Sequence, residues 1–155
     1  MNITSRLNRS AKNALLGQIK RCTLYLPFNS NVMHKKMSVE ELHKIGEHVT
    51  KLLFEGNFKE VAELYGYALS FDMPNDMAIK EEFEDSLNEC IGDLSSASIS
   101  INVKKFDKND IELSYLIECN VKLKKSSGIL VELIQSGEGS VYLEQISSYH
   151  LENHA

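Results

Sequence analysis

The chain has 155 residues and a mass of 17.5 kDa, with 43% hydrophobic and 25% charged residues. These values suit one globular domain with its own core, and they argue against a large multidomain enzyme, a disordered chain or a coiled coil. No uncharged apolar run reaches membrane-spanning length, so no membrane span is expected. The three cysteines, Cys22, Cys90 and Cys119, are scattered without a CxxC pair. They predict neither a disulfide framework nor a metal site, and they favour a reducing, cytoplasmic location.

The charge changes sign along the chain near Met37. Residues 1–39 hold seven of the 17 basic residues and no acid, whereas residues 40–155 hold ten lysines and all 22 acids, a net charge of −12. A shift this sharp predicts a basic N-terminal extension over residues 1–36 and a domain over residues 37–155. The acidic balance of the domain disfavours nucleic acid as a partner, because it repels phosphate.

The basic extension has a helical pattern of its own. Its apolar residues recur at steps of three and four from Ile3 to Ile19, beside Arg6, Arg9 and Lys12. This composition is typical of an organellar transit peptide or a membrane-surface helix, and it also suits a flexible or loosely docked extension. An organellar location is therefore the alternative to a cytoplasmic one.

Three helices are predicted in the first half of the domain. Ser38 and Glu41 form a capping box ahead of an apolar face, which predicts a helix over about residues 38–55 that ends at Gly56-Asn57. A second, shorter helix follows, and a third opens at residues 74–76 and stops at Gly92. The apolar faces expected for the second and third helices are Phe58, Val61, Leu64, Tyr65 and Leu69, and then Ile79, Phe83, Leu87, Cys90 and Ile91.

After the third helix the apolar period changes from helical to alternating, which predicts four antiparallel strands. Three-residue hairpin loops are predicted at residues 107–109, 126–128 and 137–139, each ending in Asn or Gly. The predicted class is α+β, with N-terminal helices packed on a curved four-stranded antiparallel meander. The cross-strand partners that these loops predict are Val103 with Leu113, Val121 with Leu133, Leu133 with Leu143, Lys104 with Glu112, and Lys122 with Glu132.

The stretch LLFEGNFKEVAELYGYAL, residues 52–69, resembles a motif of the nuclear transport factor two-like superfamily, also called cystatin-like. Members often show an apolar helix end, Gly-Asp or Gly-Asn, an aromatic residue and an Ala-x-Leu-aromatic helix. The matching positions are Gly56, Asn57, Phe58, Ala62, Leu64 and Tyr65. The likeness covers residues 38–150 and lacks the short hairpin that many members have between their second and third helices. It implies a cone-shaped sheet around the longest helix, in a superfamily of isomerases, cyclases, ligand binders and immunity proteins.

An enzyme or ligand carrier of this superfamily would need polar groups inside the cone. The inward face of the predicted strands offers no Asp, Glu or His, so no catalytic residue is predicted. The residues expected to line such a pocket are Tyr65, Tyr115, Cys119, Gln145 and Tyr149. The apolar neighbours of Cys119 favour a small core residue over a nucleophile. No cofactor motif or metal-ligand spacing is found, so no cofactor is predicted.

The outward face of the same strands is unexpectedly apolar. A solvated face should be nearly all polar, so large apolar residues ringed by charge predict a surface covered by another chain. The residues of this predicted interface are Leu116, Leu130, Glu132, Ile134, Tyr142, Glu144 and Ile146. A homodimer through this face is the leading expectation, and a basic N-terminal helix folded over it is the alternative.

Composition and pattern together favour a small non-enzymatic binding protein whose acidic surface suits a basic protein partner. An immunity protein that neutralises a basic toxin is the most concrete form of this hypothesis, because opposite charge speeds capture. The alternative hypothesis is a cone-pocket protein that binds a small ligand or acts as an isomerase or cyclase.

Overall fold

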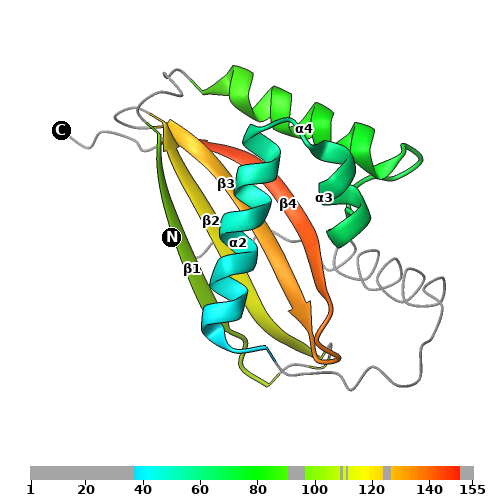
Figure 1. Ribbon diagram of the computed structural model, residues 1–155, viewed down its shortest axis with the longest axis vertical. Coiled ribbons are helices and arrows are strands. Elements are labelled where there is room, and N and C mark those ends of the chain that lie inside the picture. The colour runs from blue at the N-terminus through cyan, green and yellow to red at the C-terminus, as the bar shows by residue number, and fades with distance from the viewer. Residues whose placement is uncertain (1–36, 91–96, 109, 111, 124–126, 151–155) are drawn as a thin grey trace. The chain divides into compact units, whose positions relative to one another are not determined.

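Three helices followed by four strands make up the residues that the computed structural model describes, 37–90, 97–108, 110, 112–123 and 127–150. The helices are α2 (Val39–Phe54), α3 (Phe58–Tyr65) and α4 (Asn75–Glu89), and the strands are β1 (Ser98–Lys105), β2 (Leu113–Leu123), β3 (Ser127–Ser136) and β4 (Val141–His150). The strands form one antiparallel sheet in the order β1-β2-β3-β4 (Figure 1). The predicted α+β class and meander are confirmed, while the predicted basic extension lies outside the described residues.

Capping residues and glycine set the ends of the helices. Ser38 caps α2, since its Oγ accepts a hydrogen bond from the N–H of Glu41 at 3.2 Å and the Glu41 carboxylate accepts one from the N–H of Ser38 at 2.8 Å. Gly56 follows this helix with a φ of 77°, in the left-handed region that glycine tolerates. Pro74 precedes α4, and Asp76 lies in the first turn, where the helix dipole favours a negative charge. The predicted stop at Gly92 lies outside the described residues.

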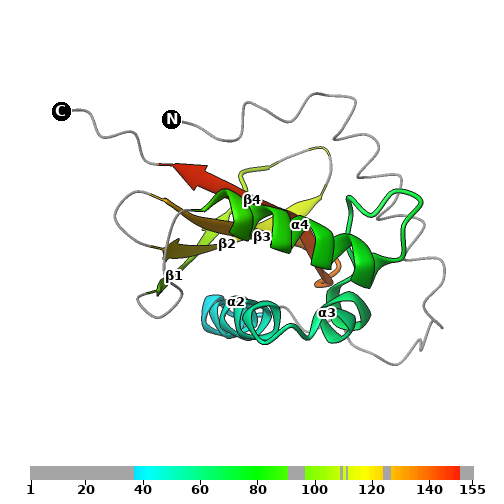
Figure 2. The ribbon, with the colours of Figure 1, turned by 90° about the horizontal axis from the view of Figure 1, so that it is seen from above.

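The helices cover one face of the sheet (Figure 2), with α2 against β1 and β2 and α4 against β4. Helix α2 approaches the sheet closely at Gly46. A Cβ added there would lie 2.9 Å from Ile101 and 3.0 Å from both Ile117 and Cys119. Glycine is therefore the residue that lets this helix pack directly on two strands.

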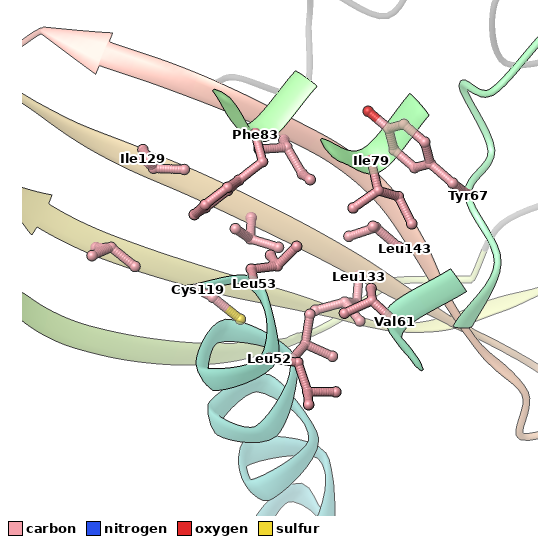
Figure 3. Close-up of a cluster of buried hydrophobic side chains, with 14 of the residues drawn as sticks. Leu52, Leu53, Val61, Tyr67, Ile79, Phe83, Cys119, Ile129, Leu133 and Leu143 are labelled. Atoms are coloured by element: carbon pink, nitrogen blue, oxygen red, sulfur yellow. The ribbon is translucent and has the colours of Figure 1, made fainter. Parts of the chain in front are cut away.

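Side chains from all three helices meet the inner face of the sheet in one apolar core (Figure 3). Leu53 of α2, Val61 of α3 and Ile79 of α4 are fully buried. Leu133 of β3 is fully buried in the same cluster. The ring of Phe83, 3% exposed, makes an edge-to-face contact with Phe54 at a centroid distance of 5.1 Å. The helices are thus fixed to the sheet by residues of the predicted apolar faces.

The predicted hairpin between β3 and β4 is confirmed. The N–H of Ser136 donates to the carbonyl oxygen of Ser140 at 2.9 Å, which leaves residues 137–139 as the loop. Gly139 closes this loop with a φ of 94°, the conformation predicted for its third position. The predicted pairing of Leu133 with Leu143 is also observed.

The other two predicted hairpin loops are wrong in length or position. Val103 pairs with Ile117 instead of Leu113, because the β1–β2 connection, residues 106–112, exceeds three residues. Val121 pairs with Ile129 instead of Leu133, since Gly128 lies inside β3 and not in a loop. Both errors displace the register by an even number of residues. Because side chains alternate with period two, an even displacement leaves side chains on their predicted faces, except at Leu113, where the register of β2 shifts before Tyr115.

A β-bulge in β4 changes the faces of the residues that follow it. Leu133 pairs with Leu143 while Glu132 pairs with Gln145. Glu144, between these two pairings, is therefore the extra residue of the bulge. The bulge shifts Ile146 into the core, where it is fully buried, so its predicted place on the outward face is wrong. By the same shift the residues from Gln145 onward exchange their predicted faces.

Candidate functional site

The outward face of the sheet, opposite the helices, carries most of the predicted interface. One cross-strand row contains Lys104, Leu116, Ile134 and Tyr142, and the next contains Asn102, Glu118, Glu132 and Gln145. Leu116 and Ile134 are 8% and 3% exposed, although neither belongs to the core cluster under the helices. Leu130 and Tyr142 are half-buried. This face therefore offers a second protein less accessible apolar surface than the sequence suggests, and self-association through it stays a prediction.

The charges on the outward face are partly neutralised within the sheet. The Nζ of Lys104 lies 2.8 Å from a carboxylate oxygen of Glu118, so the predicted pairing of Lys104 with Glu112 is wrong. Glu132 lies directly opposite Glu118 and not beside Lys122. Burial, and then the charge of Glu118, raise the pKa of Glu132, while Lys104 partly offsets that shift.

The five residues expected to line a cone pocket lie on different sides of the sheet. Cys119 belongs to the core, and Tyr65 and Tyr115 pack against that core. Gln145 and Tyr149 lie on the outward face because of the bulge, so their predicted inward position is wrong. These five residues therefore cannot line a single cavity, because the sheet separates them.

Two of these residues have clear structural roles. The hydroxyl of Tyr149 donates to Oδ1 of Asn120 at 2.5 Å, and its ring fills the space that a side chain at Gly128 would need. Burial raises the pKa of Cys119 to about 12, and a hydrogen bond with Thr50 only partly offsets this. The thiol therefore remains protonated at neutral pH, as expected of a small core residue.

One hollow of about 670 Å³ lies at the hairpin end of the sheet, beside Tyr115. It is open to solvent and lined mainly by the β1–β2 connection and the β3–β4 turn, with Lys105, Asp107, Lys108, Glu112 and Glu138 among its residues. Its size suits a small ligand, but small-molecule sites are usually enclosed and mostly apolar. The hollow gives only weak geometric support to the pocket hypothesis.

Helix α4 has an acidic outer face that sequence reasoning did not single out. Residues 75–89 contain six acids and one lysine, a net charge of −5. The helix buries Ala78, Ile79, Phe83 and Ser86 against the core, which leaves the acids Glu81, Glu82, Glu84, Asp85 and Glu89 exposed. The excess of acid over lysine in this segment was the signal available in the sequence.

Helices α2 and α3 pair their charges, whereas α4 does not. The ion pairs four residues apart on α2 and α3, counting the C-cap residue Glu55, are Glu40 with Lys44, Lys51 with Glu55, and Lys59 with Glu63, and His43 lies 3.5 Å from Glu47 and forms a further pair when protonated. Within the described part of the chain, no acid of α4 forms an ion pair. The hydroxyl of Ser148 donates a hydrogen bond to the carboxylate of Glu89. The donor is an uncharged group, so this contact is not an ion pair.

The acids of α4 repel one another. Four pairs of them are three or four residues apart, a spacing that brings side chains together on a helix, and each such pair destabilises a helix by roughly 0.2–0.5 kcal/mol. Partial desolvation raises the pKa of Glu82, and the nearby charges of Asp85, Glu89 and Glu81 raise it further. No basic residue occupies the last turn, where the helix dipole would favour one. The outer face of α4 therefore holds negative charge at a cost in stability.

The connection between α3 and α4 exposes apolar side chains. Leu64 and Leu69 were expected on the buried face of the second helix, but they are 53% and 37% exposed. Leu64 lies within α3 on its exposed side, whereas Leu69 follows the end of α3 at Tyr65, where Gly66 with a φ of 64° takes the chain off the helical path. Phe71, 76% exposed, follows in the same connection.

Comparison with models of known protein families, with curated proteins and with solved structures gave no match. Among the described residues, no helix is long and apolar enough to cross a membrane. No group of three or more His, Cys, Asp or Glu side chains in that part of the chain has the arrangement of a metal site. The strongest candidate for function is thus a surface, the acidic outer face of α4.

Proposed function

We propose that this chain is a small non-enzymatic binding protein that captures a basic protein through the acidic outer face of α4. The observation that carries the proposal is the set of exposed acids on α4 without an ion pair among the described residues. Their mutual repulsion destabilises the free protein, and a cationic partner would turn it into attraction. Departures from local stability rules are expected at functional sites.

An immunity protein that neutralises a basic toxin is the form of this proposal that we favour. A nuclease or another toxin that acts on phosphate needs a cationic surface, and an acidic helix face is complementary to such a surface. Long-range attraction speeds the encounter, and the bound helix then blocks access of phosphate to the cationic surface. This function requires no catalytic group on the immunity protein.

We further propose that the fold belongs with the nuclear transport factor two-like superfamily. The Gly56-Asn57 break between α2 and α3 and the three helices on one face of a meander support this assignment. The connection between α3 and α4 contains no strand among its residues, 66–74, which departs from many members of the superfamily. Immunity proteins occur in this superfamily, but the fold alone does not decide function.

The test is binding of the full chain to the protein encoded beside its own gene, because an immunity gene adjoins its toxin gene. We expect calorimetry to show a complex whose Kd rises at least about tenfold between about 50 mM and about 200 mM NaCl. The double variant Glu81→Lys, Asp85→Lys should weaken binding by about a hundredfold, which corresponds to about 2.7 kcal/mol.

The matched control is Glu47→Lys with Glu55→Lys, which reverses two exposed charges, one on α2 and one at its C-cap. This control should change Kd by no more than about threefold. Equal losses for the two double variants would show that only net charge matters. Unchanged binding of the α4 variant would refute the proposed surface.

A further inference from the structure

Four exposed apolar side chains lie within a short segment beside the acidic face. They are Leu69 at 37% exposure, Phe71 at 76%, Met73 at 38% and Met77 at 56%. We call these four residues the apolar loop. Among the described residues, the other large apolar side chains exposed to this extent are Val39, Leu64 and Ile99, which lie on three different elements. An exposed apolar cluster of this kind commonly marks an interaction surface.

The apolar loop is held at both ends. Before it, Tyr67 is buried in the core and the N–H of Ala68 donates to the carbonyl oxygen of Leu143 at 3.2 Å. After it, Ala78 is buried and its N–H donates to the carbonyl oxygen of Pro74 at 3.0 Å. The segment between these anchors presents its side chains from a fixed base, which lowers the entropy lost on binding.

Phe71 occupies a position that suits glycine. The N–H of Met73 donates to the carbonyl oxygen of Ser70 at 3.0 Å, so Phe71 is the first central residue of a tight turn, and its φ is 48°. Non-glycine residues rarely adopt this conformation, and bulky ones least of all. A strained backbone and an exposed aromatic ring at one residue disfavour the free protein, which points to a role for the ring in binding.

The charges around the apolar loop define the chemistry of its partner. From Glu60 to Ile79 the chain contains four acids and no lysine or arginine. Asp72 and Asp76 lie within the loop itself. Burial, and then the charge of Glu82, raise the pKa of Tyr67 at the base of the loop. The negative potential of α4 therefore also reaches the base of the loop.

We infer that the apolar loop is the anchor of the α4 surface and that it binds an amphipathic cationic segment of the partner, with apolar side chains against Phe71 and Met77 and Lys or Arg beside the acids. This inference rests on the proposed function. It adds that charge alone is insufficient, because interface energy is concentrated in a few buried aromatic or apolar anchors while peripheral charges mainly set the association rate.

Two synthetic peptides of equal length and charge test the inference, an amphipathic Leu–Lys helix and a Ser–Lys peptide. We expect the full chain to bind the Leu–Lys helix at least about tenfold more tightly, because burial of one large apolar side chain accounts for such a factor. The double variant Phe71→Ser, Met77→Ser should lose this preference and keep the wild-type affinity for the Ser–Lys peptide. Both substituted side chains are exposed, so the variant should keep the wild-type melting temperature.

The matched control is Val39→Ser with Ile99→Ser, two side chains that are 52% and 55% exposed on other elements. This control should retain the preference for the Leu–Lys helix. In spectra of the ¹³C-labelled methionine methyl groups, the signals of Met73 and Met77 should shift with the Leu–Lys helix but not with the Ser–Lys peptide. Substitution of each methionine by leucine assigns the two signals.

The outcomes separate the inference from the proposed function. Equal affinity for the two peptides, or a preference that survives in the Phe71→Ser, Met77→Ser variant, overturns the inference. Binding of the chain to vesicles of a zwitterionic lipid with no peptide preference would also overturn it, because the loop would then be a membrane contact. If Glu81→Lys with Asp85→Lys abolishes binding of both peptides while the loop variant behaves as the wild type, the proposed function stands and the inference fails.

Discussion

Helices α2 and α4 pack against the same sheet, but they carry their surface charges in opposite ways. On α2 each exposed acid of the pairs Glu40 with Lys44 and Glu47 with His43 has a basic neighbour one turn away. On α4 the acids face one another instead, without an ion pair among the described residues. Both helices bury an apolar face, so the difference lies only outside the core. It teaches that two helices on one core can differ in surface charge, since α2 pairs its acids with basic neighbours, whereas the outer face of α4 keeps an excess of negative charge.

The largest expected effect tests whether the buried face of α4 contributes to the stability of the fold as the buried face of α2 does. Phe83→Ala should lower the free energy of unfolding by about 3–5 kcal/mol, because it removes a buried ring and leaves a cavity beside Phe54. Urea denaturation measures this loss. A loss below about 1 kcal/mol would mean that α4 is only loosely attached, and the comparison of the two helices would lose its basis.

The next effect concerns the close approach of α2 to the sheet. Gly46→Val should lower the free energy of unfolding by about 2 kcal/mol or more, because the added atoms would clash with side chains of Ile101, Ile117 and Cys119. Glu47→Val on the same helix is the control, since its side chain is exposed and its cost should stay near 0.5 kcal/mol. Equal losses in chemical denaturation would contradict close packing at Gly46, since valine has a higher helix propensity than glycine and propensity alone would not lower the stability.

A smaller effect of opposite sign should distinguish the outer faces. Asp85→Lys removes the repulsion of Asp85 by Glu81, Glu82 and Glu89, so it should raise the free energy of unfolding by about 0.5–1 kcal/mol at low salt. The gain should shrink in about 1 M NaCl, where screening is strong. Glu47→Lys on α2 breaks a favourable pair and should give no gain. A loss of stability in Asp85→Lys would contradict the account of α4 as a helix of uncompensated charge.

The smallest effect extends the comparison to Glu132, a buried acid of the sheet. The pKa of Glu132 is raised, so the folded chain binds its proton more tightly than the unfolded chain does. The free energy of unfolding therefore falls as pH rises through the window between the ordinary and the raised pKa, and the contribution of Glu132 is most favourable below that window. Glu132→Gln should remove this fall, giving a gain over wild type that appears only towards neutral pH. Urea titrations at several pH values should detect it; a gain independent of pH would contradict the assignment.

Much of the fold was predictable because its signals are local. The capping box of Ser38 and the left-handed Gly56 and Gly139 set helix and hairpin ends that the structure confirms. Loop lengths elsewhere were not predictable, since they depend on how strands meet in space. The bulge in β4 was missed, although apolar residues three apart, Leu143 and Ile146, were a signal that the alternation shifts there.

The candidate site was harder to predict because exposure is a tertiary property. The six acids in residues 75–89 are visible in the sequence, but the absence of an ion pair on any of them among the described residues is not. Leu69 fits a helical stripe by spacing, and only the end of α3 before Gly66 removes it from that stripe. Leu116 and Ile134 fit a surface patch by parity, yet both are buried.

The bulge at Glu144 restricts how the length of this protein can change during evolution. Deletion of Glu144 would restore simple alternation, with Gln145 still opposite Glu132 and Ile146 still in the core opposite Val131. Loss of the bulge residue would thus keep the core, whereas one residue added elsewhere in β4 would exchange the faces of the residues that follow it. The connection of residues 106–112 lies between strands and can change length without this exchange of faces. Among descendants of this sequence, insertions and deletions should therefore accumulate in that connection, and within β4 they should be confined to the bulge at Glu144.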